Sequence, residues 1–255
     1  MIPYNELQYH LRRRKRQIGV NKDTLFYLKQ VSSLVLIGSS CTGKSTLIDT
    51  LQKSIPVESG LIDVPLRYIT RSRRFGDRDS ENIFVSENKF KEMQRSGEIG
   101  LAWERSLHGP NTLYGFPPKK TGSVLTVYSA NNDLYHQREK LCGKDMLFME
   151  VMAPLDARIQ RMLQRSPDLS EEEIAARLRD HPFIIQETNE AMDFIPCVGD
   201  AFPWSSDYPF YMPKGFFDTR YQGHLRMYNF GNYESSSSKS FVDFVEKLAN
   251  ILEAA

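Results

Sequence analysis

The sequence predicts an α/β fold in which helices flank a mostly parallel sheet in three layers. Apolar runs of strand length, several of them rich in β-branched residues, recur along the chain at 32–40, 123–129, 145–154 and 225–230. Segments with apolar residues at helical spacing alternate with these runs. Strands that alternate with helices are typical of parallel sheets, whose buried strands read as nearly continuous apolar stretches.

Bulk composition is that of an ordinary globular protein. The chain has 255 residues, 40% of them hydrophobic and 25% charged, with a formal net charge of +1. This length suffices for one elaborated domain, and the balanced charge does not favour a nucleic-acid partner. No apolar stretch approaches the roughly 20 residues that span a bilayer. The N-terminus lacks the apolar segment of a secretory signal. We therefore expect a cytoplasmic protein without a membrane partner.

Residues 1–32 are predicted to form a basic extension ahead of the domain. The run "LRRRKR" at 11–16 could contact nucleic acid or an anionic lipid. Basic runs of this length are also common on solvated surfaces, and we favour a solvated helix face. The three cysteines, Cys41, Cys142 and Cys197, are too few and too scattered for a disulfide framework or a metal cluster.

The stretch "VLIGSSCTGKSTLI" at 35–48 joins the first predicted strand to a helix with apolar Leu47, Ile48, Leu51 and Ile55. It satisfies G-x-x-x-x-G-K-[ST], the P-loop pattern, in which glycines let backbone N–H groups point at phosphate oxygens. The N-terminal end of the helix adds positive charge. We predict that the ATP phosphates are bound by Gly38, Ser39, Ser40, Cys41, Thr42, Gly43, Lys44, Ser45 and Thr46.

Two residues of this loop have specific predicted roles. Lys44 is expected to reach the β and γ phosphates, and the Ser45 hydroxyl to ligate Mg²⁺. Cys41 is expected to be a small filler rather than a nucleophile. ATP and Mg²⁺ are therefore the expected cofactors.

The later elements follow the same alternation, with two exceptions. Helices are predicted at 155–166, at 169–180 with a capping box of Ser170 and Glu173, and at 238–252 after a short serine loop at 235–238. The stretch 64–116 is rich in arginines, acids and aromatics, which suggests a small insertion reaching over a site. The stretch 195–226 is rich in Pro, Gly and aromatics. We expect it to be an ordered insertion, because disorder goes with few aromatics.

Motifs downstream of the loop appear in an order that resembles guanylate kinases. They are T-R-x-x-R at 70–74, an F-V-S turn from Phe84 followed by an acidic helix, Trp103, and a Y-G pair at 114–115. The resemblance covers about 33–190, and the last strand and helix continue it. It implies a P-loop NTPase domain at 33–255 with an acceptor-binding insertion at about 64–116 and a lid at about 158–180.

The resemblance also assigns roles to residues. Arg71 and Arg74 would hold the phosphate of the acceptor, since guanidinium forks suit oxyanions, and Tyr114 would donate its hydroxyl to it. Phosphoryl transfer is mostly positioning and charge neutralisation. The implied catalytic residues are Lys44 with the lid arginines Arg161, Arg165 and Arg177. The alternative is that the arginines of 71–78 form a solvated basic surface, and the P-loop favours the functional interpretation.

The residues that would read guanine are different here. Guanylate kinases have a glutamate where this chain has Ala102, a serine at Phe116, an acidic pair at Tyr128 and Ala130, and a tyrosine at Asn82. A pocket without hydrogen-bonding groups for the base loses most of its discrimination, so GMP is not favoured. Tyr128 also replaces a residue linked to the metal, which weighs against efficient Mg²⁺-dependent turnover.

A closer resemblance is to ribose 1,5-bisphosphate phosphokinases. Its motifs are "RYITR" at 67–71, "SEN" at 80–82, Ala102 with Trp103, and "TLYG" at 112–115. Arg67 suggests an acceptor that carries more phosphate than base. We predict an ATP-dependent kinase of a phosphorylated small molecule, probed first with ribose 1,5-bisphosphate, whose acceptor is bound by Arg67, Arg71, Arg74 and Tyr114.

Two other functions stay open on the sequence. One is a guanylate or other nucleoside monophosphate kinase with an unfamiliar base pocket. The other is a guanylate kinase-like interaction module with little turnover. The intact P-loop argues against the second of these, and the insertion at 195–226 is foreign to both kinase families.

Overall fold

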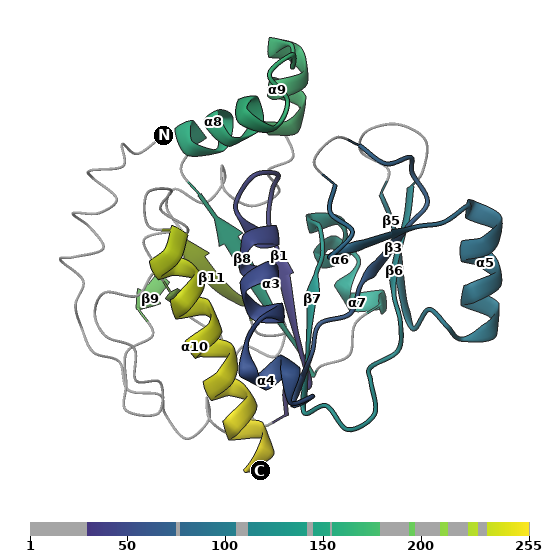
Figure 1. Cartoon of the computed structure of the whole chain (residues 1–255), viewed down its shortest axis with the longest axis vertical. Coiled ribbons are helices and arrows are strands. Elements are labelled where there is room, and N and C mark those ends of the chain that lie inside the picture. Colours follow the sequence, from purple (N-terminus) through teal and green to yellow (C-terminus); the bar gives the residue numbers. More distant parts are fainter. Residues whose placement is uncertain are drawn as a thin grey trace.

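The computed structural model describes residues 30–74, 77–105, 112–141, 145–153, 155–178, 194–196, 210–213, 224–228 and 234–254. Its main element is a seven-stranded sheet (Figure 1). The strands follow one another in the order β2 (Ile62–Asp63), β7 (Leu125–Ser129), β1 (Ser33–Ile37), β8 (Met146–Met152), β11 (His224–Tyr228), β10 (Phe210–Pro213) and β9 (Phe194–Pro196).

Five of these strands are parallel to their neighbours, which confirms the predicted mostly parallel sheet. Pairing is parallel from β2 through β7, β1 and β8 to β11, whereas β10 and β9 add an antiparallel edge. The edge strands fall largely within the stretch 195–226, so this stretch contributes to the sheet. The rest of it, and the basic run at 11–16, lie outside the described residues.

One face of the main sheet packs against two helices, α3 (Lys44–Gln52) and α10 (Glu234–Glu253) (Figure 1). Leu34 and Leu36 of β1 point to this face, and Val35 and Ile37 point to the other. Both faces of β1 are fully buried, which explains why its sequence is continuously apolar. The side chains that α3 and α10 contribute to this core are Leu47, Ile48, Leu51, Phe241, Phe244, Val245 and Leu248.

The opposite face is covered by the short helix α6 (Asn132–His136) and by a second, four-stranded sheet. That sheet contains β4 (Asn82–Phe84), β3 (Arg67–Ile69), β6 (Thr112–Phe116) and β5 (Leu101–Arg105). Its outer side packs on α5 (Glu87–Ser96) through Phe90 and Met93. The stretch 64–116 therefore builds a layer of its own beside the main sheet.

Two local predictions are wrong. The helix after the loop ends at Gln52, and a separate short helix, α4 (Ile55–Glu58), starts three residues later, with Ile55 76% exposed. Pro56 explains the break, because proline cannot continue a helix whose preceding turn it would clash with. The serines 235–238, expected to form a loop, lie in the first turns of α10. Serine suits helix starts, where backbone N–H groups lack partners within the helix.

Two further helices lie at the end of the molecule where the β1–α3 loop is found (Figure 1). They are α8 (Leu155–Arg165) and α9 (Glu171–Leu178), close to the predicted 155–166 and 169–180. The predicted capping box is confirmed, since the Ser170 hydroxyl accepts from the Glu173 backbone N–H and the Glu173 carboxylate accepts from that of Ser170. In the described part of the chain, no helix combines the length and apolar character needed to cross a membrane.

Candidate active site

The loop between β1 and α3 has the backbone conformation of a phosphate cradle. Gly38, Cys41 and Gly43 have φ angles of 140°, 62° and 98°, all in the region that glycine tolerates best. A Cβ atom on Gly38 would lie 2.4 Å from the carbonyl oxygen of Val151 on β8. Only glycine fits there, because the loop passes directly over the neighbouring strand.

Side chains of the loop fold back on its own carbonyls. The Lys44 ammonium donates to the carbonyls of Gly38 and Ser39, at 2.9 Å for the latter, and the Thr42 hydroxyl donates to Ser39 at 3.1 Å. Lys44 is also the first residue of α3, so the positive end of the helix and the ammonium group meet at the same loop.

Arginines of α8 hold the loop from the other side. Arg158 Nε donates to the Ser40 carbonyl at 3.0 Å, and Arg161 Nη1 donates to the Cys41 carbonyl at 3.2 Å. Arg158 is 1% exposed, and a buried cation so close to the loop adds to its positive potential. These bonds support the left-handed conformation of Cys41, which is costly for any residue other than glycine.

The segment that carries the predicted acceptor arginines (residues 67–74 and 77–81, called the acceptor segment below) is organised around Asp77. Both oxygens of its carboxylate accept from the Arg71 guanidinium, at 2.7 and 2.8 Å, and one also accepts from the Arg74 backbone N–H at 2.7 Å. Burial raises the pKa of Asp77, but the hydrogen bonds from Arg71 and Arg74 outweigh it and the net pKa is below its ordinary value. The carboxylate thus stays charged, and it holds the Arg71 guanidinium and the backbone at Arg74.

Arg67 links the two sheets. Its Nε and Nη2 donate to the Asn82 side-chain oxygen, at 3.2 and 2.7 Å, and its Nη1 donates to the Ser129 carbonyl at the end of β7, at 3.0 Å. Its guanidinium also lies 5.5 Å from the centre of the Tyr114 ring. Burial lowers the pKa of Arg67, and the nearby Glu81 carboxylate opposes this effect. Several of its donors are therefore committed to the protein.

A second link joins the acceptor segment to α3. Arg78 forms an ion pair with Asp49, the Ser80 hydroxyl donates to Asp49 at 3.0 Å, and the Gln52 amide donates to the Ser80 carbonyl at 2.9 Å. Each of these exposed contacts contributes little alone. Together they set the spacing between the loop and the acceptor arginines.

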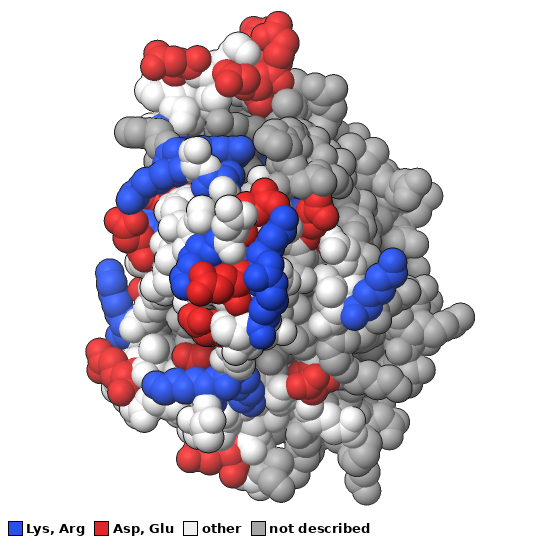
Figure 2. All heavy atoms as spheres, turned by 90° about the vertical axis from the view of Figure 1, so that its right-hand side faces the viewer, with Lys and Arg blue, Asp and Glu red and all other residues white. Residues whose placement is uncertain are grey.

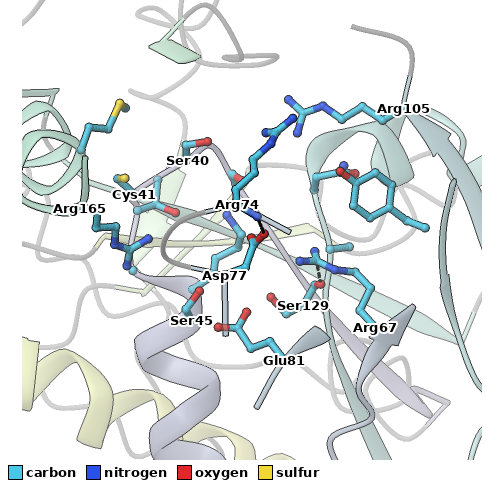
Figure 3. Close-up of a pocket in the computed structure, with 18 of the residues that line it drawn as sticks. Ser40, Cys41, Ser45, Arg67, Arg74, Asp77, Glu81, Arg105, Ser129 and Arg165 are labelled. Atoms are coloured by element: carbon cyan, nitrogen blue, oxygen red, sulfur yellow. Dashed lines mark hydrogen bonds between the residues drawn. The ribbon is translucent and has the colours of Figure 1, made fainter. Parts of the chain in front are cut away.

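The loop, the acceptor segment and α8 surround one cavity of about 700 Å³ (Figure 3). The predicted site residues that line it are Gly38, Ser40, Cys41, Thr42, Gly43, Lys44, Ser45, Arg67, Arg71, Arg74, Tyr114 and Arg165. Ser39, Thr46 and Arg161 lie outside the lining, and Arg161 contacts the back of the loop instead. Arg177 belongs to α9, but its side chain is outside the described ones.

Several lining residues were not predicted from the sequence, among them Asp77, Glu81, Arg105, Ser129 and Asn131. Residue spacing could have pointed to two further arginines, Arg105 in the cavity lining and Arg158 at the loop. Arg105 follows Trp103 by two residues in a strand and therefore shares its face, and Arg158 precedes Arg161 by three residues, close to one helical turn. Asp77 and Glu81 come from irregular segments, where the spacing of residues does not tell which way a side chain points.

The cavity offers ligands that suit Mg²⁺. Mg²⁺ prefers oxygen ligands and commonly uses one or two protein carboxylates together with phosphate and water. Ser45 lines the cavity together with Asp77 and the buried Glu81, and the Glu81 carboxylate points toward the Ser45 hydroxyl (Figure 3). Among the described residues, no group of three or more His, Cys, Asp or Glu side chains gathers as a metal cluster. The set fits a metal held mainly by the nucleotide.

Tyr128 lies near the end of β7, and its ring is buried. It is 4% exposed and packs against Phe116 with ring centres 4.7 Å apart, outside the cavity lining. Phe116, in turn, contacts Trp103, which stacks on Tyr114. Of the positions expected to read guanine, 116 and 128 are therefore filled by packed aromatic rings, and Tyr128 lies outside the cavity that Ser45 lines.

The burial of Tyr128 predicts an alkaline effect on stability. Burial, followed by the nearby Asp63 carboxylate, raises the pKa of Tyr128 from 10.0 to about 12. Between these values the unfolded chain loses a proton that the folded protein keeps, so the free energy of unfolding falls as pH rises. We expect this fall to be smaller in Tyr128→Phe. Urea unfolding of both proteins at several pH values in this window measures the fall in the free energy of unfolding. An equally large fall in Tyr128→Phe would contradict the expectation.

The face of the molecule that carries α5 shows positive and negative side chains side by side (Figure 2). On α5 itself, Lys89 pairs with Glu92 and Lys91 with Glu87. Mixed charge of this kind is typical of a solvated surface rather than of a nucleic-acid-binding face.

No family model matches the sequence, and no curated protein matches it significantly. Among solved structures, guanylate kinase from Anaplasma phagocytophilum is similar, with a TM-score of 0.43 and 16% sequence identity. The similarity covers 88% of this chain and 85% of that chain. It is a distant likeness. The α/β fold class follows from the sheet order and from the loop between β1 and α3.

Proposed function

We propose that this chain is an ATP-dependent phosphotransferase whose acceptor is a phosphorylated small molecule, in particular a sugar phosphate such as ribose 1,5-bisphosphate. In this reaction the bond from the γ phosphorus to the β–γ bridging oxygen breaks, and its electron pair stays with ADP. A new bond forms from the γ phosphorus to an oxygen of the acceptor's phosphate. The product carries a diphosphate.

One observation carries the proposal: the phosphate loop and the acceptor arginines line the same cavity. Lys44 comes from the loop and Arg165 from α8, and Arg71 and Arg74 come from the acceptor segment. Figure 3 shows Arg165 and Arg74 on the cavity. Two groups of phosphate ligands that open onto one space can hold a donor and an acceptor in contact. Such positioning supplies much of the acceleration in phosphoryl transfer.

Each group of cavity residues has a separate role. Backbone N–H groups of the loop and Lys44 hold the donor phosphates, and Arg165 neutralises charge on the group being transferred. Arg71, fixed by Asp77, holds the acceptor phosphate, and Ser45 and Glu81 would hold Mg²⁺. When bound, Mg²⁺ offsets charge on the phosphate oxygens. The cavity volume of about 700 Å³ is also in the range of small-molecule sites.

The choice of acceptor is supported by the aromatic packing beside the cavity. Phe116 and Tyr128, at positions where guanine would be read, are buried against one another and present no hydrogen-bonding edge to the cavity. The cationic lining residues are Lys44, Arg67, Arg71, Arg74, Arg105 and Arg165, against three carboxylates, Asp77, Glu81 and Glu173. The excess of positive charge in the lining favours an acceptor rich in phosphate.

Arg71→Ala tests the acceptor assignment. Removing a guanidinium that binds the acceptor phosphate should raise the acceptor KM or lower kcat by about 10- to 100-fold, with little change in ATP affinity. Steady-state kinetics at varied acceptor and calorimetric ATP binding measure the two effects. Arg73→Ala is the matched control, because Arg73 is two residues away, outside the cavity lining and 54% exposed. Equal kinetics for wild type and Arg71→Ala would place the acceptor elsewhere.

A further inference from the structure

We propose that Arg105 and Arg74 form a clamp for a second phosphate of the acceptor, separate from the phosphate that receives the γ-phosphoryl group. This inference rests on the proposed function, since it names the part of the acceptor that this end of the cavity recognises. It also makes Arg105 a specificity-determining residue.

The geometry of the two arginines carries the proposal. Arg74 belongs to the acceptor segment and Arg105 to the end of β5, and both line the cavity. Their guanidinium groups point toward one another (Figure 3). Arginine stays positively charged at any physiological pH, so two such groups repel, and an oxyanion placed between them removes the repulsion while accepting paired hydrogen bonds.

Arg105 is held in this direction by its surroundings. Leu101, Trp103 and Arg105 alternate along β5, and the first two lie in the core facing the main sheet. The Arg105 Nε lies 3.5 Å from a carboxylate oxygen of the buried Asp133 on α6. The neighbouring Trp103 donates to the Asn131 side chain at 2.8 Å, which ties β5 to the residue before α6. The Arg105 Nε thus faces the Asp133 carboxylate, and its guanidinium lies in the cavity lining beside Arg74 (Figure 3).

Arg67 is a less suitable ligand for this second phosphate. Its donors already bind the Asn82 side chain and the Ser129 carbonyl, and losing these would remove its link between the two sheets. Arg71 is the proposed ligand of the phosphate that receives the γ-phosphoryl group. The clamp of Arg74 and Arg105 is therefore the better candidate for binding the second phosphate, which the sequence alone suggested through Arg67.

The test compares two acceptors that share the receiving phosphate and differ by the second one, ribose 1,5-bisphosphate and ribose 1-phosphate, at saturating Mg·ATP. For Arg105→Gln, the KM for the bisphosphate should rise about 10- to 100-fold, with kcat and the monophosphate KM nearly unchanged. Arg73→Gln is the control for loss of one positive charge on this side of the protein. Equal effects of Arg105→Gln on both acceptors would overturn the clamp.

Arg105→Gln leaves Asp133 without its ion-pair partner, so folding is checked by thermal unfolding. Arg105→Lys keeps a positive charge beside Asp133 but lacks the planar fork, and Arg74→Gln changes an exposed side chain. Both should raise the bisphosphate KM selectively, and selectivity unchanged in both would contradict the proposal.

If the wild-type protein phosphorylates neither sugar, the proposed function fails. The clamp is then tested by anion binding alone. Calorimetry then measures pyrophosphate binding to the ADP-loaded protein, in which ADP fills the loop. Weaker binding by Arg105→Gln and Arg74→Gln, but not by Arg73→Gln, supports the anion clamp. Equal affinities in all variants overturn it.

Discussion

Lys44→Ala should abolish phosphoryl transfer and leave the fold intact. Lys44 is the lysine of the P-loop pattern, and its ammonium lies over the loop carbonyls at the cavity wall. Loss of one preorganised charge at a developing phosphate charge typically costs about 10²- to 10³-fold in rate. Because we expect Lys44 to reach both donor phosphates, the loss should be at least the upper value. ADP release from Mg·ATP with saturating acceptor measures the effect.

The fold should tolerate this change because alanine is the best helix former and Lys44 starts α3. Thermal unfolding and far-UV circular dichroism check this expectation. Lys53→Ala, at the exposed C-terminal end of the same helix, is the matched control and should keep full activity. Full activity in Lys44→Ala would contradict the assignment of the loop.

Gly38→Ala should destabilise the protein strongly, and more than the comparable change Gly60→Ala. The new Cβ would lie 2.4 Å from the Val151 carbonyl oxygen, a backbone atom that cannot move alone, and the φ of 140° is strained for alanine. We expect a loss of about 3 kcal/mol or more in the free energy of unfolding, together with loss of ATP binding. Urea unfolding and calorimetric ATP titration measure these effects.

Gly60→Ala separates backbone strain from crowding. Gly60 also has a positive φ, 80°, but nothing lies within 4 Å of its added Cβ. It should cost only about 1 to 2 kcal/mol, the usual penalty for a left-handed non-glycine residue, and leave ATP binding unchanged. Similar losses in the two variants would show that the contact with Val151 is unimportant.

The parts of the fold that local patterns determine were predictable. The continuous apolar run of β1, the glycines of the loop and the capping box of Ser170 and Glu173 each depend on neighbours a few residues away. Ile55 belongs to a separate short helix although its apolar spacing continues that of α3, because Pro56 directly after it cannot continue the first helix.

The direction of long side chains was not predictable. Tyr128 was expected near the metal, but its ring turns into the core against Phe116. Arg158 and Arg105 act across the fold, on the Ser40 carbonyl and beside Asp133, and such contacts depend on how elements pack. Arg67 was assigned to the acceptor alone, whereas most of its bonds hold protein groups.

ADP release from Mg·ATP, measured with ribose 1,5-bisphosphate, ribose 5-phosphate, GMP and AMP in turn, tests the proposed reaction most directly. Lys44→Ala serves as the blank for each acceptor. The cavity of Lys44, Arg71 and Arg105 predicts release that depends on the bisphosphate and exceeds that with either nucleotide. Release with GMP alone, or none with any acceptor while ATP still binds, would contradict a sugar-phosphate kinase.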